Sequence, residues 1–141
     1  MSKKTQQWIQ QLIAGLDEHV DKETCAKILE ECGRQCTPAS LVKKAKTLYE
    51  ASSDVGEFLE KLGEVFEELQ IEDDGVYVVY PRCYCPQIEG IAPGKLSATY
   101  CNCSRGWIKQ LFEGAIGQEV SVKLVKSIVD GATQCRFKVE L

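Results

Sequence analysis

The segment "LQIEDDGVYVVYP", residues 69–81, decides the fold, because the spacing of apolar residues changes there from a helical period to a strand period. Residues 76–80 are rich in β-branched and aromatic residues, which are typical of strands. Asp73, Asp74 and Gly75 separate two short apolar runs and predict a hairpin turn. A sheet is therefore expected from about residue 71 onward, with a helical half before it.

Upstream of this segment, apolar residues recur at helical spacing in four amphipathic stretches. The predicted helices cover roughly residues 4–18, 21–35, 37–49 and 53–69. In the first of them, the residues from Trp8 to Leu16 follow one helix face that we expect to enter the core. Asp21 is a predicted N-cap, and Thr37 with Pro38 predicts an N-cap followed by proline in the first turn.

Downstream of residue 81, a strand is predicted over 95–103, then a helix from Ser104 closed by Gly117, and finally a β-hairpin around Asp130 and Gly131. The expected fold class is α+β, with N-terminal helices packed on a small antiparallel sheet and a helix and final β-hairpin at the C-terminus. We expect a single domain, residues 1–141, with a helical half over 4–70 and a sheet-rich half over 71–141.

The overall composition excludes several classes of protein. The chain has 141 residues, of which 44% are hydrophobic and 27% charged, as in ordinary globular domains. A net charge of −4 argues against nucleic acid as a direct partner. No stretch of 18 apolar residues predicts a membrane span, and the N-terminal residues lack the apolar run of a signal peptide. We therefore expect a cytoplasmic protein that does not contact the membrane.

Eight cysteines are many for such a chain, and in a reducing compartment they favour metal binding or redox chemistry over disulfides. Residues 82–106, "RCYCPQIEGIAPGKLSATYCNCSRG", hold two Cys-x-Cys pairs. If both pairs lie in antiparallel strands, each pair presents its sulfurs on one face, at a spacing suited to tetrahedral zinc. The predicted ligands are Cys83, Cys85, Cys101 and Cys103. Redox, copper or iron–sulfur sites and buried structural cysteines are the alternatives.

A second group of cysteines, Cys25, Cys32 and Cys36, falls on the helix predicted over residues 21–35, at a spacing that indicates one inward face. Cys25 is expected to be a core residue. Cys32 and Cys36 lie one turn apart and form a possible additional thiol site, with a core role as the alternative.

Each of the four arginines lies within two residues of a cysteine. A guanidinium group lowers the pKa of a nearby thiol and binds carboxylates. Arg34, Arg82 and Arg105 are therefore candidate contacts for an anion or ligand, and Arg136 lies beside Cys135. The alternative is chance clustering on solvated turns.

Residues 100–141, "YCNCSRGWIKQLFEGAIGQEVSVKLVKSIVDGATQCRFKVEL", resemble the end of the 4-vinyl reductase domain family. The likeness rests on a Tyr-Cys strand end, a helix ending in glycine, and a hairpin finishing G-x-x-x-C-x-F, here Gly131 to Phe137. That family is similar to the haem-nitric-oxide-binding fold and serves as a small-molecule-binding module. The resemblance therefore implies an α+β fold and a small organic ligand.

The resemblance also implies a metal site. Cys101 and Cys135 match cysteines that help hold a structural zinc in the metal-bearing members of that family. Those members add a Glu and a Cys at the positions of Leu124 and Ser127, so the usual ligand set is incomplete here. The missing ligands would come from other cysteines of the chain, Cys83, Cys85 and Cys103.

Three classes of function remain open. The favoured one is a cysteine-rich, zinc-binding, sensor-like module that takes a small organic ligand and forms a homodimer. The second is a redox or transfer enzyme with low-pKa thiols, with Cys32, Cys36 and Cys103 as candidates. The third is a structural zinc protein that acts through protein partners. Iron–sulfur or haem would replace zinc if the protein absorbed visible light, and no motif indicates hydrolytic catalysis.

Overall fold

The computed structural model describes residues 2–81, 88–92, 95–128 and 134–141. In these residues, helices and strands follow each other in the order α1 (Lys3–His19), α2 (Lys22–Cys36), α3 (Ala39–Glu50), α4 (Val55–Val65), β1 (Leu69–Glu72), β2 (Gly75–Tyr80), the 3-10 helix η1 (Ala98–Cys101), α5 (Asn102–Ile116), β3 (Ser121–Lys126) and β4 (Cys135–Glu140). The order confirms the α+β class, with the helices first and a β-hairpin last. None of these described helices has the length and apolar character needed to cross a membrane.

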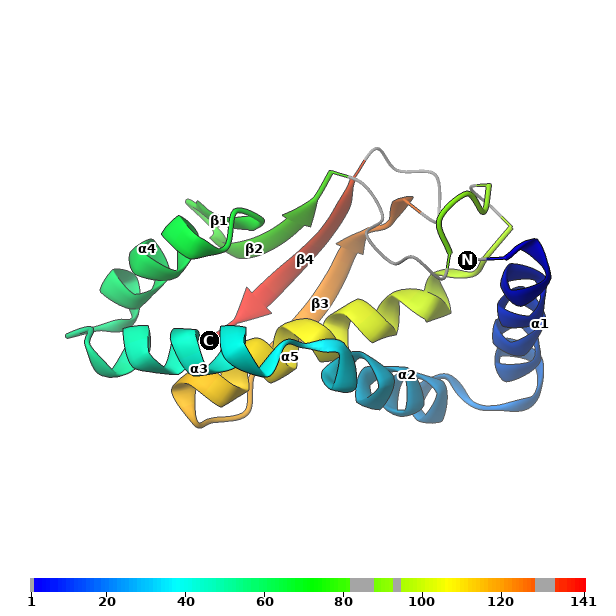
Figure 1. Ribbon diagram of the computed structural model, residues 1–141, viewed down its shortest axis with the longest axis horizontal. Coiled ribbons are helices and arrows are strands. Elements are labelled where there is room, and N and C mark those ends of the chain that lie inside the picture. Colours follow the sequence, from blue (N-terminus) through cyan, green and yellow to red (C-terminus); the bar gives the residue numbers. More distant parts are fainter. Residues whose placement is uncertain (1, 82–87, 93–94, 129–133) are drawn as a thin grey trace.

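The sheet has the strand order β1-β2-β4-β3, and all neighbouring strands are antiparallel. The last strand thus inserts between β2 and β3, as Figure 1 shows. Helix α5 contacts β3 on one side and α2 and α3 on the other, so it lies between the sheet and these two helices. This central position makes α5 the element that connects the two halves of the chain.

One hydrophobic cluster contains residues from all five α-helices and all four strands. Its largest fully buried members are phenylalanines from α4, α5 and β4, namely Phe58, Phe112 and Phe137. Burial of one such side chain stabilises a fold by about 1.5–3 kcal/mol. Leu111 of α5 and Val122 of β3 are also fully buried in this cluster, each with 0% exposure.

Helices α2 and α5 touch through their backbones, because each has a glycine at the crossing. A Cβ atom on Gly33 would lie 1.7 Å from the carbonyl oxygen of Cys103. A Cβ atom on Gly106 would lie 1.9 Å from the carbonyl oxygen of Glu30. Any side chain at either position would therefore push the two helices apart.

Local signals predicted several helix ends correctly. Asp21 caps α2 by accepting a hydrogen bond from the Thr24 N–H at 2.9 Å, and Asp54 caps α4 in the same way. Gly117 ends α5 in the left-handed conformation, with φ of 81°. The prediction for Thr37 was wrong: its hydroxyl donates to the carbonyl oxygens of Gly33 and Trp107, and Pro38 takes the N-cap position of α3 without a side-chain cap.

The strand predicted over residues 95–103 is wrong. Residues 98–101 form η1, and α5 follows directly from Asn102. The hydroxyl of Ser97 accepts a hydrogen bond from the Thr99 N–H at 3.0 Å, which satisfies one of the unpaired donors of a helix start. The helix predicted over 53–69 is also shorter than expected, because it ends at Val65 and Phe66 is extended.

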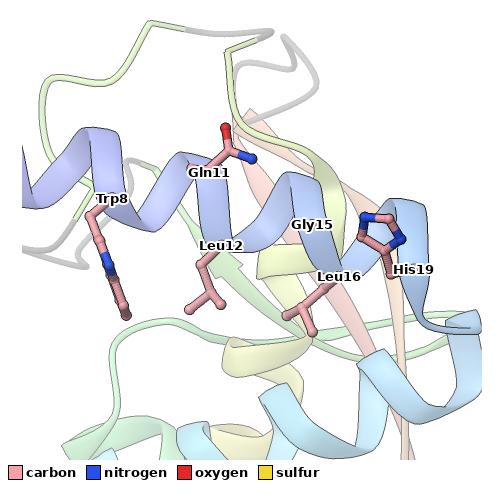
Figure 2. Close-up of a pocket in the computed structure, with 6 residues that line it drawn as sticks. All are labelled: Trp8, Gln11, Leu12, Gly15, Leu16 and His19. Atoms are coloured by element: carbon pink, nitrogen blue, oxygen red, sulfur yellow. The ribbon is translucent and has the colours of Figure 1, made fainter.

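Helix α1 lies at the edge of the molecule (Figure 1) and is less buried than its apolar pattern predicted. Ile13 is buried, but Trp8 is 65% exposed and Leu12 is 46% exposed. Figure 2 shows both side chains, with Leu16, extending from one side of the helix. Gln10 donates a hydrogen bond to the Lys95 carbonyl oxygen at 3.0 Å, which helps to hold α1 to the fold.

Candidate functional site

Two buried cysteines meet the segment that follows β3. The Sγ atom of Cys101, at the N-cap of α5, lies 3.0 Å from the Oγ atom of Ser127. The next residue, Ile128, donates its backbone N–H to the Sγ atom of Cys135 at 3.3 Å. The exposed fractions of Cys101, Ser127 and Cys135 are 5%, 3% and 6%. Cys101 and Cys135, which are far apart in the sequence, thus contact two consecutive residues, Ser127 and Ile128.

A shift in strand register explains why Ser127 is buried. In β3, Val122 faces the core, while Ser121 and Lys123 face solvent. Simple alternation would put residue 127 on the solvent face. The pairing of β3 with β4 shifts between Leu124 and Lys126, and one extra residue in a strand reverses the faces that follow it. The hydroxyl of Ser127 therefore reaches Cys101.

The two buried cysteine sulfurs could supply part of the ligand set of a soft metal ion. Cysteine sulfur is a preferred ligand of zinc, and a structural zinc site needs four ligands. Cys101 and Cys135 supply two sulfurs. In the described part of the chain, no group of three or more Cys, His, Asp or Glu side chains is arranged to hold a metal. Cys103 is half-buried in the first turn of α5. Cys83 and Cys85 lie outside the described residues.

The helical conformation of residues 98–116 changes the geometry predicted for the second Cys-x-Cys pair. In a strand, Cys101 and Cys103 would present both sulfurs on one face. They lie instead at the junction of η1 and α5. Residues two apart in an α-helix point about 200° away from each other. The square arrangement of four thiols on two paired strands is therefore wrong.

Helix α2 separates its three cysteines. Cys25 is buried, and its Sγ atom donates to the Leu16 carbonyl oxygen at 3.3 Å. Burial raises the pKa of the Cys25 thiol, so this residue has the expected core role. Cys32 and Cys36 are exposed free thiols, so the prediction of a common inward face was wrong. The close crossing at Gly33 decides this, because it turns the face of Cys25, Leu29 and Gly33 inward.

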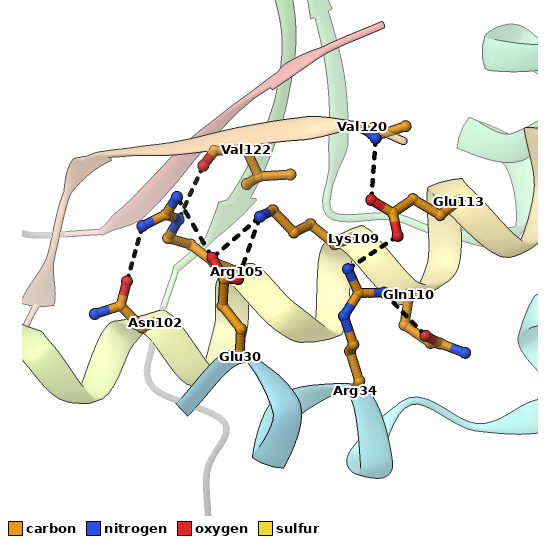
Figure 3. A network of polar contacts seen from close by, with 9 residues as sticks. All are labelled: Glu30, Arg34, Asn102, Arg105, Lys109, Gln110, Glu113, Val120 and Val122. Carbon is orange, nitrogen blue, oxygen red and sulfur yellow. Dashed lines mark hydrogen bonds and ion pairs between the residues drawn. The ribbon is translucent and has the colours of Figure 1, made fainter. Parts of the chain in front are cut away.

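Two of the candidate arginines connect helices to each other (Figure 3). The Nη2 atom of Arg34 lies 2.9 Å from a carboxylate oxygen of Glu113, and Nη1 donates to the Gln110 side chain at 3.1 Å. The other Glu113 oxygen accepts the backbone N–H of Val120 at 3.0 Å. Arg34 therefore connects α2 to α5, and Glu113 connects α5 to the start of β3.

Arg105 holds α5 to β3 and to α2. Its Nε atom donates to the Val122 carbonyl oxygen at 2.9 Å, and Nη2 lies 3.5 Å from Glu30. Lys109 approaches the same Glu30 carboxylate at 3.1 Å (Figure 3). Carboxylates of the chain therefore pair with both Arg34 and Arg105. Arg82 lies outside the described residues, and Arg136 binds Glu72 and stacks 3.9 Å from the Tyr77 ring centre.

A comparison with protein-family models identifies the family of this chain. The family model for DUF6144, described as a family of unknown function, matches residues 1–141. The chain belongs to the DUF6144 family. No curated protein matches it.

Sequence reasoning missed a shallow apolar groove on this DUF6144 chain. Its volume is about 310 Å³, and the described residues that line it all belong to α1: Trp8, Gln11, Leu12, Gly15, Leu16 and His19 (Figure 2). The pattern of Trp8 and Leu12 predicted core residues, because an apolar stripe looks the same whether it faces the chain's own core or a surface. Gly15, two turns after Trp8 on the same helix face, was the available signal for an open face.

Proposed function

We propose that the chain is a metal-binding, sensor-like module in which Cys101 and Cys135 hold a structural zinc. The observation that carries this proposal is the convergence of both buried sulfurs on Ser127 and Ile128. The resemblance to the 4-vinyl reductase domain family supports it, because the same two cysteines and the position of Ser127 belong to the zinc site of metal-bearing members.

In this proposal, zinc ties the start of α5 to both strands of the final hairpin. Cys101 belongs to the η1–α5 junction and Cys135 begins β4, while Ser127 follows β3. A bound zinc ion would neutralise the thiolates and stabilise this junction. The two remaining ligands would come from Cys103, Cys83 and Cys85.

The small organic ligand would bind next to this site. Tyr80 is the register partner of Cys135, and its ring centre lies 6.2 Å from that of Phe137. Tyr100 precedes Cys101 and is buried. Two aromatic residues adjoining the thiols suit a planar organic molecule. We further propose that the protein works in the cytoplasm as a homodimer and signals through other proteins.

Elemental analysis of anaerobically purified, untagged protein tests the metal proposal. We expect about one zinc per chain. Cys101→Ser and Cys135→Ser should lose the zinc, and the exposed control Cys32→Ser should retain it. Protein that contains no zinc and takes none up, while folded by circular dichroism, would overturn the proposal.

A thiol-based redox or transfer enzyme is the second candidate. The exposure of Cys32 and Cys36, one turn apart on α2, favours it. Rapid alkylation of these two thiols at neutral pH, in protein without zinc, would support this candidate over the first.

A further inference from the structure

We propose that α1 is the homodimer interface, and that it pairs antiparallel with α1 of a second copy. This inference rests on the homodimer part of the proposed function and is independent of the zinc site. Its starting point is the exposed apolar groove on α1, where Trp8 is 65% and Leu12 46% exposed. Such side chains arranged along one helix face mark an interaction surface.

The face is complementary in shape to itself. Trp8 is a large projecting side chain, and Gly15, two turns later, has nothing within 4 Å of the place where a Cβ would be. An axis of two-fold symmetry passing between Gln11 and Leu12 would set residue 8 of each copy opposite residue 15 of the other. Each indole ring then lies over a glycine, where the helices can approach closely.

The face is also complementary in charge to itself. Lys4, Gln11 and Glu18 recur every seven residues and therefore share one flank of the groove. All three are exposed. In this register Lys4 of one copy is level with His19 of the other, so its long side chain reaches the neighbouring Glu18 on the same flank, and the symmetry repeats this ion pair at the opposite end. The positive N-terminal end of each helix also meets the negative C-terminal end of its partner.

This pattern favours a second copy over another protein as the occupant. The lysines of the first turn, the acidic Asp17 and Glu18 beside His19 in the last turn, and a glycine two turns after a tryptophan fulfil the requirement of a two-fold interface, in which one surface must fit itself. A foreign helix would impose no such symmetry on α1. Leu12, close to the proposed axis, would contact its own counterpart at the centre.

Sedimentation velocity of the full chain over a wide range of concentration tests this interface. We expect the wild type to dimerise reversibly. Gly15→Leu should be monomeric, because the new side chain takes the place of the partner's Trp8. The variant should still fold, because nothing lies within 4 Å of the Cβ position at residue 15. The matched control is Gly63→Leu in α4, where the space is also open, and it should remain dimeric.

A charge reversal tests the direction of the pairing. Lys4→Glu should raise the dissociation constant of the dimer about tenfold, because two like-charged pairs replace two ion pairs. The double variant Lys4→Glu with Glu18→Lys should restore it. A dimeric wild type that Gly15→Leu and Lys4→Glu leave unchanged would overturn the α1 interface and leave the homodimer standing. A wild type that stays monomeric would overturn both, whatever its zinc content.

Discussion

The crossing of α2 and α5 gives the sharpest prediction, because a single added methyl group should destabilise the protein. In Gly33→Ala, the new Cβ would lie 1.7 Å from the carbonyl oxygen of Cys103, whereas real Cβ contacts are essentially never below 3.0 Å. The obstacle is backbone within a helix, which cannot rotate away. The two helices must therefore separate by more than about 1 Å at this point.

The expected loss follows from two opposing terms. Alanine is favoured over glycine in a helix interior by about 1 kcal/mol. Overpacking costs about 1–3 kcal/mol and more where nothing can move, and the separation also stretches the ion pair between Arg34 and Glu113. Because the obstructing backbone cannot rotate away, the upper end of the overpacking range applies, and the free energy of unfolding should fall by about 2 kcal/mol. This loss lowers Tm by about 6 °C in a chain of this size.

Chemical denaturation of matched variants measures this effect. Gly63→Ala makes the same change in α4, where nothing lies within 4 Å, and should raise the free energy of unfolding by up to about 1 kcal/mol. Gly114→Ala meets only the Val42 side chain, at 2.4 Å, and should lose less than Gly33→Ala. If Gly33→Ala proved as stable as Gly63→Ala, the close backbone crossing would be refuted.

Three further predictions concern individual side chains. The Ser53 hydroxyl and backbone N–H donate to Glu57 and lower the pKa of its carboxyl to about 2. The stability that the ionised carboxylate contributes is therefore complete above a pH of about 4.5 and is lost as the pH falls toward about 2. Denaturation curves over this range should therefore fall less steeply for Glu57→Gln than for the wild type, and equal slopes would contradict the assignment. Native alkylation followed by peptide mass spectrometry should label Cys32 quickly and Cys25 slowly, because burial raises the pKa of the Cys25 thiol, and fast labelling of Cys25 would show that its site is open. Ser127→Cys should tighten zinc binding in competition with a chromophoric chelator, because a thiolate is a better zinc ligand than a hydroxyl, whereas unchanged binding would remove residue 127 from the proposed site.

The candidate site came from a family resemblance, which implied that Cys101, Cys135 and the position of Ser127 belong to one zinc site. That zinc site stays a prediction; the structure shows that Cys101 contacts Ser127 and that Cys135 contacts the next residue, Ile128. The burial of Ser127 was not predictable, because it depends on a register shift that arises from pairing with β4. The exposure of Cys32 was not predictable either, because it depends on how α2 packs against α5 at Gly33.

The sequence by itself determined the α+β class, the order of the elements apart from the strand wrongly predicted over 95–103, and several helix ends. Caps such as Asp21 and turns such as Gly117 act within a few residues, so neighbours in the sequence suffice to define them.

Only the tertiary structure decided which helix faces are buried and where the thiols lie. The glycine contact between α2 and α5 rotates Cys25 inward and leaves Cys32 exposed, and α1 keeps Trp8 at the surface although its pattern is that of a core helix. An apolar stripe predicts that a helix face will be buried, but it does not predict against which surface. That depends on packing between segments that are distant in the chain.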